Sequence, residues 1–181
     1  MSLSINLGGI TYAFRDLKEL FAKANEQKSG DELAGIAAET VQERIAAKAV
    51  LSDILLKDIR GNPLIPYEED EVSRLLDEDL NEPIYNEIQH WSVAELREYI
   101  LRIDVTNTEL RRMSRGLTSE MIAAVTKLMS NMDLVYAANK IEIITTCNSA
   151  IGQRGTLSSR LQPNHPTDNI DGIMASLKEG L

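Results

Sequence analysis

The chain has 181 residues, enough for one domain with a hydrophobic core or for one domain and a piece of another. Its formal net charge of −9 and its pI of about 4.8 argue against nucleic acid and anionic membranes as partners, because both require a concentrated basic surface. A single cysteine, Cys147, excludes an internal disulfide, and the absence of a secretory signal and of any apolar run of roughly 18 residues predicts a soluble, cytoplasmic protein without a membrane span.

The first residues are predicted to form a β-hairpin over about residues 4–14. Apolar and polar residues alternate on both sides of Gly8 and Gly9, a pair that tolerates the positive φ of a two-residue turn. Asp16 then has the type and position of an N-cap and predicts a helix to about Asn25. Aromatic residues make up only 4% of the chain, so the core must be aliphatic, which favours helices over the rest of the domain.

A long second helix is predicted from the cap residue Asp31 to about Arg60, where Gly61-Asn62-Pro63 ends it. Its many alanines allow neighbouring helices to approach closely. An apolar stripe that recurs every four residues is expected to face the core. The stripe begins with Leu33, Ala37, Val41 and Ile45 and drifts to Val50, Ile54 and Leu55.

Charged residues form two groups. Residues 68–82 hold eight acidic residues and one basic residue, Arg74, which predicts a helix with solvated acids and an apolar face. The apolar positions are Val72, Leu75, Leu76 and Leu80. A calcium loop needs Asp or Asn at alternating positions and a central glycine, and this stretch lacks them, so no metal site is assigned. Arg111, Arg112 and Arg115 are interpreted as solvated charges on a short helix or turn.

Two further helices have clear start signals. Ser92 and Glu95 form a capping-box pattern that opens a helix to Leu101, and Trp91 is placed to pack back on it. Thr118 caps a later helix. Its buried face is expected to contain Ile122, Val125, Met129, Met132 and Tyr136.

The end of the chain is predicted to form one strand, one loop and one helix. Alternation over residues 156–162 places Arg160 and Gln162 on the same face of a strand, and Thr167 is expected to cap the helix that follows the loop at 164–166. A parallel strand needs neighbours and covering helices, so the unit reads as part of a larger α/β domain. In a barrel, Arg160 and Gln162 would lie at the end where active sites form. A solvent-facing strand with incidental polar residues remains the alternative.

Several sequence strings together resemble the ethanolamine ammonia-lyase large-subunit family. Their order and spacing, over essentially the whole chain, are more specific than any one of them. They are Ala22-Lys23-Ala24-Asn25-Glu26, Ser29-Gly30-Asp31, Gln42-Glu43-Arg44, Glu95-Leu96-Arg97-Glu98-Tyr99, Gly116-Leu117-Thr118-Ser119-Glu120 and Ser158-Ser159-Arg160-Leu161-Gln162-Pro163-Asn164.

The pattern and the resemblance together predict two domains. We expect a mainly α amino-terminal domain over residues 1–150 with a short β-hairpin at its start. Residues 151–181 are expected to be the first strand and helix of a truncated TIM-type (β/α)8 barrel. On this view the chain is the amino-terminal part of a large subunit and is inactive alone. A non-catalytic helical scaffold or oligomerisation module is the alternative from another functional class.

The resemblance implies an enzyme that converts ethanolamine to acetaldehyde and ammonia by adenosylcobalamin radical chemistry. Arg160 and Gln162 match the family's substrate-binding residues: a guanidinium suits the substrate hydroxyl, and the Gln162 carbonyl can accept from the ammonium. No catalytic residue, metal ligand or cofactor-binding residue is assigned within the chain. A base-off corrinoid site would show Asp-x-His-x-x-Gly, and neither His90 nor His165 lies in that pattern.

The resemblance also implies an assembly. Cobalamin is expected to bind base-on between the large subunit and a separate small subunit. Large subunits are expected to form dimers grouped into a hexamer, often inside a bacterial microcompartment. The remaining active-site residues would lie outside this chain.

Overall fold

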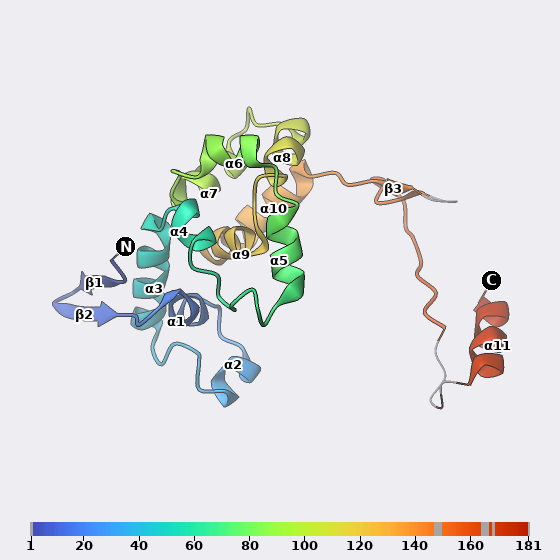
Figure 1. The fold of residues 1–181 in the computed structure, drawn as a ribbon, viewed down its shortest axis with the longest axis horizontal. Helices are drawn as coiled ribbons and strands as arrows, with labels where there is room; N and C mark the ends of the chain where they lie inside the picture. Colours follow the sequence, from blue (N-terminus) through green and yellow to red (C-terminus); the bar gives the residue numbers. More distant parts are fainter. Residues whose placement is uncertain (1, 147–149, 164–166, 168, 181) are drawn as a thin grey trace. The chain divides into compact units, whose positions relative to one another are not determined.

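The computed structural model describes residues 2–146, 150–163, 167 and 169–180, and the chain divides into two compact units, Met1–Ile141 and Glu142–Leu181 (Figure 1). The described part is mainly helical, as predicted. The first unit contains, in chain order, β1 (Ser4–Leu7), β2 (Ile10–Ala13), α1 (Leu17–Lys23), α2 (Ser29–Leu33), α3 (Val41–Asp53), α4 (Leu56–Arg60), α5 (Glu71–Glu78), α6 (Glu82–Ile88), α7 (Val93–Leu101), α8 (Asn107–Ser114), α9 (Ser119–Leu128) and α10 (Asn131–Lys140). The second unit contains β3 (Thr145–Thr146), β4 (Ala150–Ile151) and α11 (Ile170–Gly180).

The hairpin prediction is confirmed. β1 and β2 pair antiparallel, with Ser4 opposite Ala13 and Leu7 opposite Ile10. The two turn residues, glycines 8 and 9, have φ of 60° and 85°, the left-handed conformation that a tight hairpin turn requires. An isolated two-stranded hairpin is marginal in water, and here β1 packs against α3.

Helix α3 is the centre of the first unit. It packs against α1, β1, α7 and α9, and Ala46 and Ala47 on its inner face are fully buried. These small side chains let the neighbouring helices approach closely, as the alanine content predicted. The largest completely buried side chains come from α1, α3, α4, α7 and α9: Leu20, Leu51, Leu56, Ile59, Val93, Leu96 and Met121.

The single long helix predicted from Asp31 to Arg60 is wrong, since three shorter helices occupy this stretch. Thr40 starts α3 anew, because its hydroxyl accepts from the Glu43 N–H at 3.0 Å. Helix α3 ends at Ile54, which turns to extended backbone (ψ 132°). The Ile54 carbonyl then accepts from the Val93 N–H at 2.9 Å, and Leu56 N donates to Trp91 O at 2.9 Å. These hydrogen bonds with Trp91 and Val93 take the place of the backbone bonds that a continued helix would form.

The predicted apolar stripe of this stretch is also wrong in its first half. Leu33, Val41 and Ile45 are 91%, 55% and 54% exposed. In its second half Val50 and Ile54 are buried as predicted. Ala46, Ala47 and Leu51 complete the buried face of α3. The break before Thr40 resets the helical phase, so the stripe of the first segment does not continue into the second.

The start of α7 is as predicted. The Ser92 hydroxyl accepts from Glu95 N at 3.2 Å, and the Glu95 carboxylate accepts from Ser92 N at 2.7 Å. Trp91 packs back on the helix with its ring centroid 5.1 Å from that of Tyr99. At the other end, the Lys140 ammonium donates to the carbonyl oxygens of Ile100 and Arg102 at 2.8 and 2.6 Å. These bonds satisfy carbonyl groups that have no partner within the last turn of α7.

The helix predicted to follow Thr118 divides into α9 and α10. Thr118 caps α9 as expected, but the chain leaves the helix at Met129 (ψ 138°), and Ser130 forms a capping box with Asp133 that starts α10. Val125 and Met129 are buried as predicted. The other three members of the predicted face are exposed: Ile122 (44%), Met132 (73%) and Tyr136 (38%). Met132 and Tyr136 follow the break, which rotates them away from the core.

The acidic stretch forms α5 with its acids largely solvated, but its apolar face is not buried. Val72, Leu75 and Leu76 are 67%, 51% and 51% exposed, and only the following Leu80 packs on the core. The arginine cluster also behaves as predicted: Arg111 and Arg112 lie on α8 with exposed side chains.

The second unit consists of a short antiparallel pair, an irregular segment and a helix. Thr145 pairs with Ile151, and Thr146 with Ala150. Residues 156–163 have no strand pairing, so the predicted strand is not seen in the structure. α11 forms as expected, but its cap is Asn169, whose side-chain oxygen accepts from Gly172 N at 2.9 Å, and not Thr167. Cys147 and the 164–166 loop with His165 lie outside the described residues.

Within the ranges that the structure describes, no helix combines the length and apolar character needed to cross a membrane.

Candidate functional site

The two predicted substrate-binding residues lie on the irregular segment of the second unit. Arg160 and Gln162 both have exposed side chains. They are two positions apart, which places their side chains on one face wherever the backbone is extended. The segment begins after Gly155, whose φ of 70° makes the turn, and leads toward α11.

Packing of the segment onto α11 involves the residue between the two polar ones. A Cβ at Gly180, the last residue of α11, would collide with the side chain of Leu161. Leu161 therefore lies against the helix. In an extended conformation, alternation places Arg160 and Gln162 on the side opposite Leu161.

The chemistry available on that side is hydrogen bonding to a small polar molecule. Arg160 has a planar fork of five N–H donors and keeps its charge, while Gln162 has one acceptor oxygen and two donors. Two such side chains can orient a hydroxyl and an amine, but neither is a general base. No proton abstraction is assigned to them.

Metal binding finds no support in the described part of the chain. No group of three His, Cys, Asp or Glu side chains there is arranged to hold an ion. His90 is exposed in the turn between α6 and α7.

Sequence reasoning missed a charged cluster centred on Arg60. Its guanidinium donates to the Asp77 carboxylate at 2.8 and 3.2 Å and to Glu82 at 3.0 Å. It also lies over the Tyr85 ring, 4.4 Å from the centroid. The hydrogen bonds that Arg60 donates to both carboxylates, Glu82 first, raise the pKa of Arg60, and Arg60 lowers the pKa of Glu82. The cluster joins α4, α5 and α6, and its members are far apart in sequence, so no local pattern signals it.

A second cluster gathers three of the sequence strings that carry the family resemblance. The Lys127 ammonium of α9 donates to the side chain of Asn25. Asn25 in turn donates to Asp31 at 3.2 Å. Close by in sequence, Lys23 pairs with Glu43 at 3.3 Å.

Burial lowers the pKa of Lys127, a shift that is common at functional sites but also occurs in structural networks. The contacts of Lys127 favour the structural role. Its ammonium lies 5.7 Å from the centroid of the Phe21 ring and bonds to the segment after α1. We therefore interpret this cluster as a polar joint between α9 and the first helices.

Comparison with known proteins agrees with the resemblance. The family model described as "Ethanolamine ammonia lyase large subunit (EutB)" matches residues 12–181. The chain is 50% identical over 181 residues to the proteins named "Ethanolamine ammonia-lyase large subunit" from Escherichia coli (strain K12) and from Salmonella typhimurium (strain LT2). Each alignment covers 100% of this chain and 40% of the relative. The chain thus spans about 40% of the length of the curated relatives it matches.

Proposed function

The chain belongs to the ethanolamine ammonia-lyase large-subunit family, and from that membership we propose that it forms part of a subunit that converts ethanolamine to acetaldehyde and ammonia. The observation that carries the proposal is the identity of 50% maintained over all 181 residues, with the family model covering residues 12–181. Because the chain spans only about 40% of its relatives, the activity is proposed for the complete subunit and not for this chain alone.

Residues 151–181 are proposed to supply the first strand and helix of a TIM-type (β/α)8 barrel, after a helical domain over residues 1–150. Alternation over residues 156–162 and the formation of α11 support this arrangement. An extended segment pairs as a parallel strand only when neighbouring strands offer hydrogen-bond partners. In the complete barrel such neighbours flank the first strand on both edges.

Arg160 and Gln162 are proposed to bind the substrate. Ethanolamine carries a hydroxyl and, at neutral pH, an ammonium. The Arg160 guanidinium donates to the hydroxyl oxygen and repels the ammonium, and Gln162 accepts from the ammonium through its carbonyl oxygen. The pair thus discriminates the two ends of the molecule and holds one orientation. Counter-charges for the ammonium would come from parts of the subunit outside this chain.

Adenosylcobalamin is the proposed cofactor, and it supplies the radical by homolysis of its cobalt–carbon bond. Neither histidine lies in the Asp-x-His-x-x-Gly sequence of a base-off corrinoid site, so the proposed binding mode is base-on, between the large subunit and a separate small subunit. No step of the reaction is therefore assigned to a contact between this chain and the cofactor.

A small subunit is the proposed partner, since a protein named as a large subunit implies one. Dimers grouped into a hexamer are the proposed assembly.

Steady-state kinetics of a chimera test the proposal. The segment of the Escherichia coli large subunit that matches this chain is replaced by the chain, and the protein is combined with the small subunit and adenosylcobalamin. We expect ammonia release by the chimera, loss of at least about 100-fold in kcat/KM for Arg160→Ala, and partial activity for Arg160→Lys, which keeps the charge but loses the fork.

The matched control is Arg115→Ala, which removes an exposed arginine of the first unit. Its kinetics should equal those of the parent chimera. A folded chimera without turnover would favour the scaffold alternative. Equal loss of stability and turnover in Arg160→Ala would show that the residue is structural and would contradict its role in substrate binding.

A further inference from the structure

The apolar side of helix α5 faces outward and its polar side faces the rest of the first unit, which reverses the usual orientation of a surface helix. Its polar side faces the rest of the first unit: Asp77 accepts two hydrogen bonds from Arg60 of α4, at 2.8 and 3.2 Å. Its apolar side faces outward, where Val72, Leu75 and Leu76 are 67%, 51% and 51% exposed. A helix at the periphery of a folded unit ordinarily buries its apolar face and exposes its polar one (Figure 1).

These three side chains form one continuous strip. They are spaced at i, i+3 and i+4, so they are neighbours on the same face of the helix. Singly exposed apolar residues such as Leu33 and Ile103, at 91% and 92%, are common on protein surfaces. A clustered strip with a polar border is instead typical of an interaction site.

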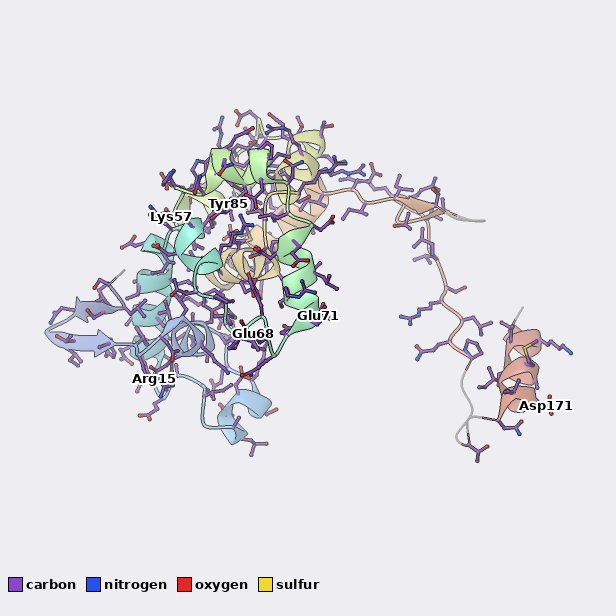
Figure 2. The ribbon with its side chains drawn as sticks, viewed as in Figure 1. Arg15, Lys57, Glu68, Glu71, Tyr85 and Asp171 are labelled. Atoms are coloured by element: carbon purple, nitrogen blue, oxygen red, sulfur yellow. The ribbon has the colours of Figure 1, made fainter. Side chains whose placement is uncertain are left out.

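The border of the strip is strongly acidic. Residues 68–82 contain eight carboxylates and one arginine, a balance of −7, whereas the whole chain carries −9. The one arginine, Arg74, is already bonded to Glu71 and Glu78 of its own helix. Glu68 precedes α5 and Glu71 is its first residue (Figure 2). Asp79 follows its last turn. Both ends of the strip therefore carry negative charge.

The negative charge around the strip determines which kind of partner can bind to it. A second copy of the chain would bring an identical acidic segment to the strip, and like charges brought together across an interface cost free energy. An anionic membrane surface is repelled for the same reason. A protein helix with an apolar face bordered by Lys and Arg fits both features, because its apolar side chains cover the strip and its cations reach the carboxylates.

We propose that the outward face of α5, formed by Val72, Leu75 and Leu76, is the docking site for a basic amphipathic helix of a partner protein. Arg60 holds the helix in the required orientation from the inner side. The site lies in the first unit and does not depend on the proposed lyase activity.

Fluorescence anisotropy with the 181-residue chain tests the proposal. The probe is a labelled helical peptide of about five turns with Leu on one face and Lys on both borders, and its twin has Glu in place of Lys. We expect micromolar binding of the Lys peptide and no binding of the twin. Leu75→Ser with Leu76→Ser should weaken binding at least about tenfold, because both substitutions remove apolar surface that the peptide buries. The matched control, Leu33→Ser with Ile103→Ser, should bind like the parent chain.

Two further variants separate docking from nonspecific charge attraction. Leu75→Asp with Leu76→Asp adds negative charge but removes the apolar strip, and we expect weaker binding. Glu68→Gln with Glu69→Gln should weaken binding and reduce its salt dependence. Circular dichroism verifies that each variant folds, and the Gln pair leaves the strip intact. Failure of the Lys peptide to bind, equal binding of its twin, or tighter binding by the Asp variant would overturn the proposal.

Discussion

Replacing Gly116 with alanine tests a close approach between two segments of the first unit. Gly116 follows α8 and is buried against the start of α6. A Cβ at this position would lie 2.8 Å from Ile84 Cγ2, 2.8 Å from the Tyr85 backbone nitrogen and 3.0 Å from the Ile84 carbonyl carbon. The neighbouring Arg115 carbonyl accepts from Asn81 N at 2.9 Å, which holds the two segments at this separation. The methyl group therefore cannot enter unless α6 moves.

The magnitude follows from two opposing terms. Overpacking against backbone atoms costs about 1–3 kcal/mol, because a helix and not a flexible side chain must shift. Loss of glycine entropy in the unfolded chain offsets about 0.4–1 kcal/mol of this. We expect Gly116→Ala to lower the free energy of unfolding by about 1–2 kcal/mol, and the melting temperature by about 3–8 °C for a unit of this size.

Differential scanning calorimetry measures the effect, with Gly30→Ala as the control. Gly30 lies in α2, and a Cβ there would meet no atom within 4 Å. The same substitution should raise stability by up to about 1 kcal/mol there, because alanine is the better helix former. The two variants should therefore shift the melting temperature in opposite directions. An unchanged or raised melting temperature for Gly116→Ala would refute the close packing of α6 on this residue.

Two other predictions concern charged contacts. Arg60→Met leaves the half-buried Asp77 carboxylate without its charged partner. The substitution should lower the free energy of unfolding in urea by about 2 kcal/mol. A loss below about 0.5 kcal/mol would contradict the role of this contact in holding α5. The second concerns pH: the pKa of Asp133 is lowered, chiefly by hydrogen bonding to Arg97 and then by the Ser130 N–H. A carboxyl whose folded pKa is lowered stabilises the fold fully above its unfolded pKa of about 4 and loses this as pH falls through the folded pKa. Asp133→Asn should therefore reduce the slope of urea midpoint against pH below about pH 4, and an unaltered slope would count against the contact.

Features encoded by a few adjacent residues were predictable. The hairpin follows from Gly8 and Gly9, and the start of α7 follows from the spacing of Ser92 and Glu95, because each needs only local hydrogen bonds or φ angles. Thr118 likewise begins α9 as expected.

Features that depend on distant segments were not predictable. Helix α3 stops at Ile54 because its carbonyl bonds to Val93, the first residue of α7, and three helices lie between α3 and α7 in the chain. Similarly, the pattern of α5 favours a buried apolar face, but Arg60 binds Asp77 on the polar side and turns the strip outward. Periodicity alone identifies an amphipathic helix without determining which side the rest of the protein will bind.

The candidate site likewise combines a feature that the local sequence predicts with one that depends on distant segments. Alternation places Arg160 and Gln162 on one face of a strand, and the family resemblance assigns them to substrate. The structure shows both side chains exposed on an unpaired segment. Strand formation there requires hydrogen-bond partners from other strands, and no pattern within residues 156–162 can supply them.

Substrate binding by Arg160 and Gln162 is best tested by a crystal structure of the chimeric large subunit with the small subunit and bound ethanolamine. We expect residues 156–162 to pair as a barrel strand, with Arg160 nitrogens about 2.7–3.2 Å from the substrate hydroxyl oxygen and the Gln162 carbonyl oxygen at a similar distance from the ammonium. Ethanolamine bound elsewhere, with Arg160 and Gln162 directed into solvent, would show that these residues do not form the substrate site.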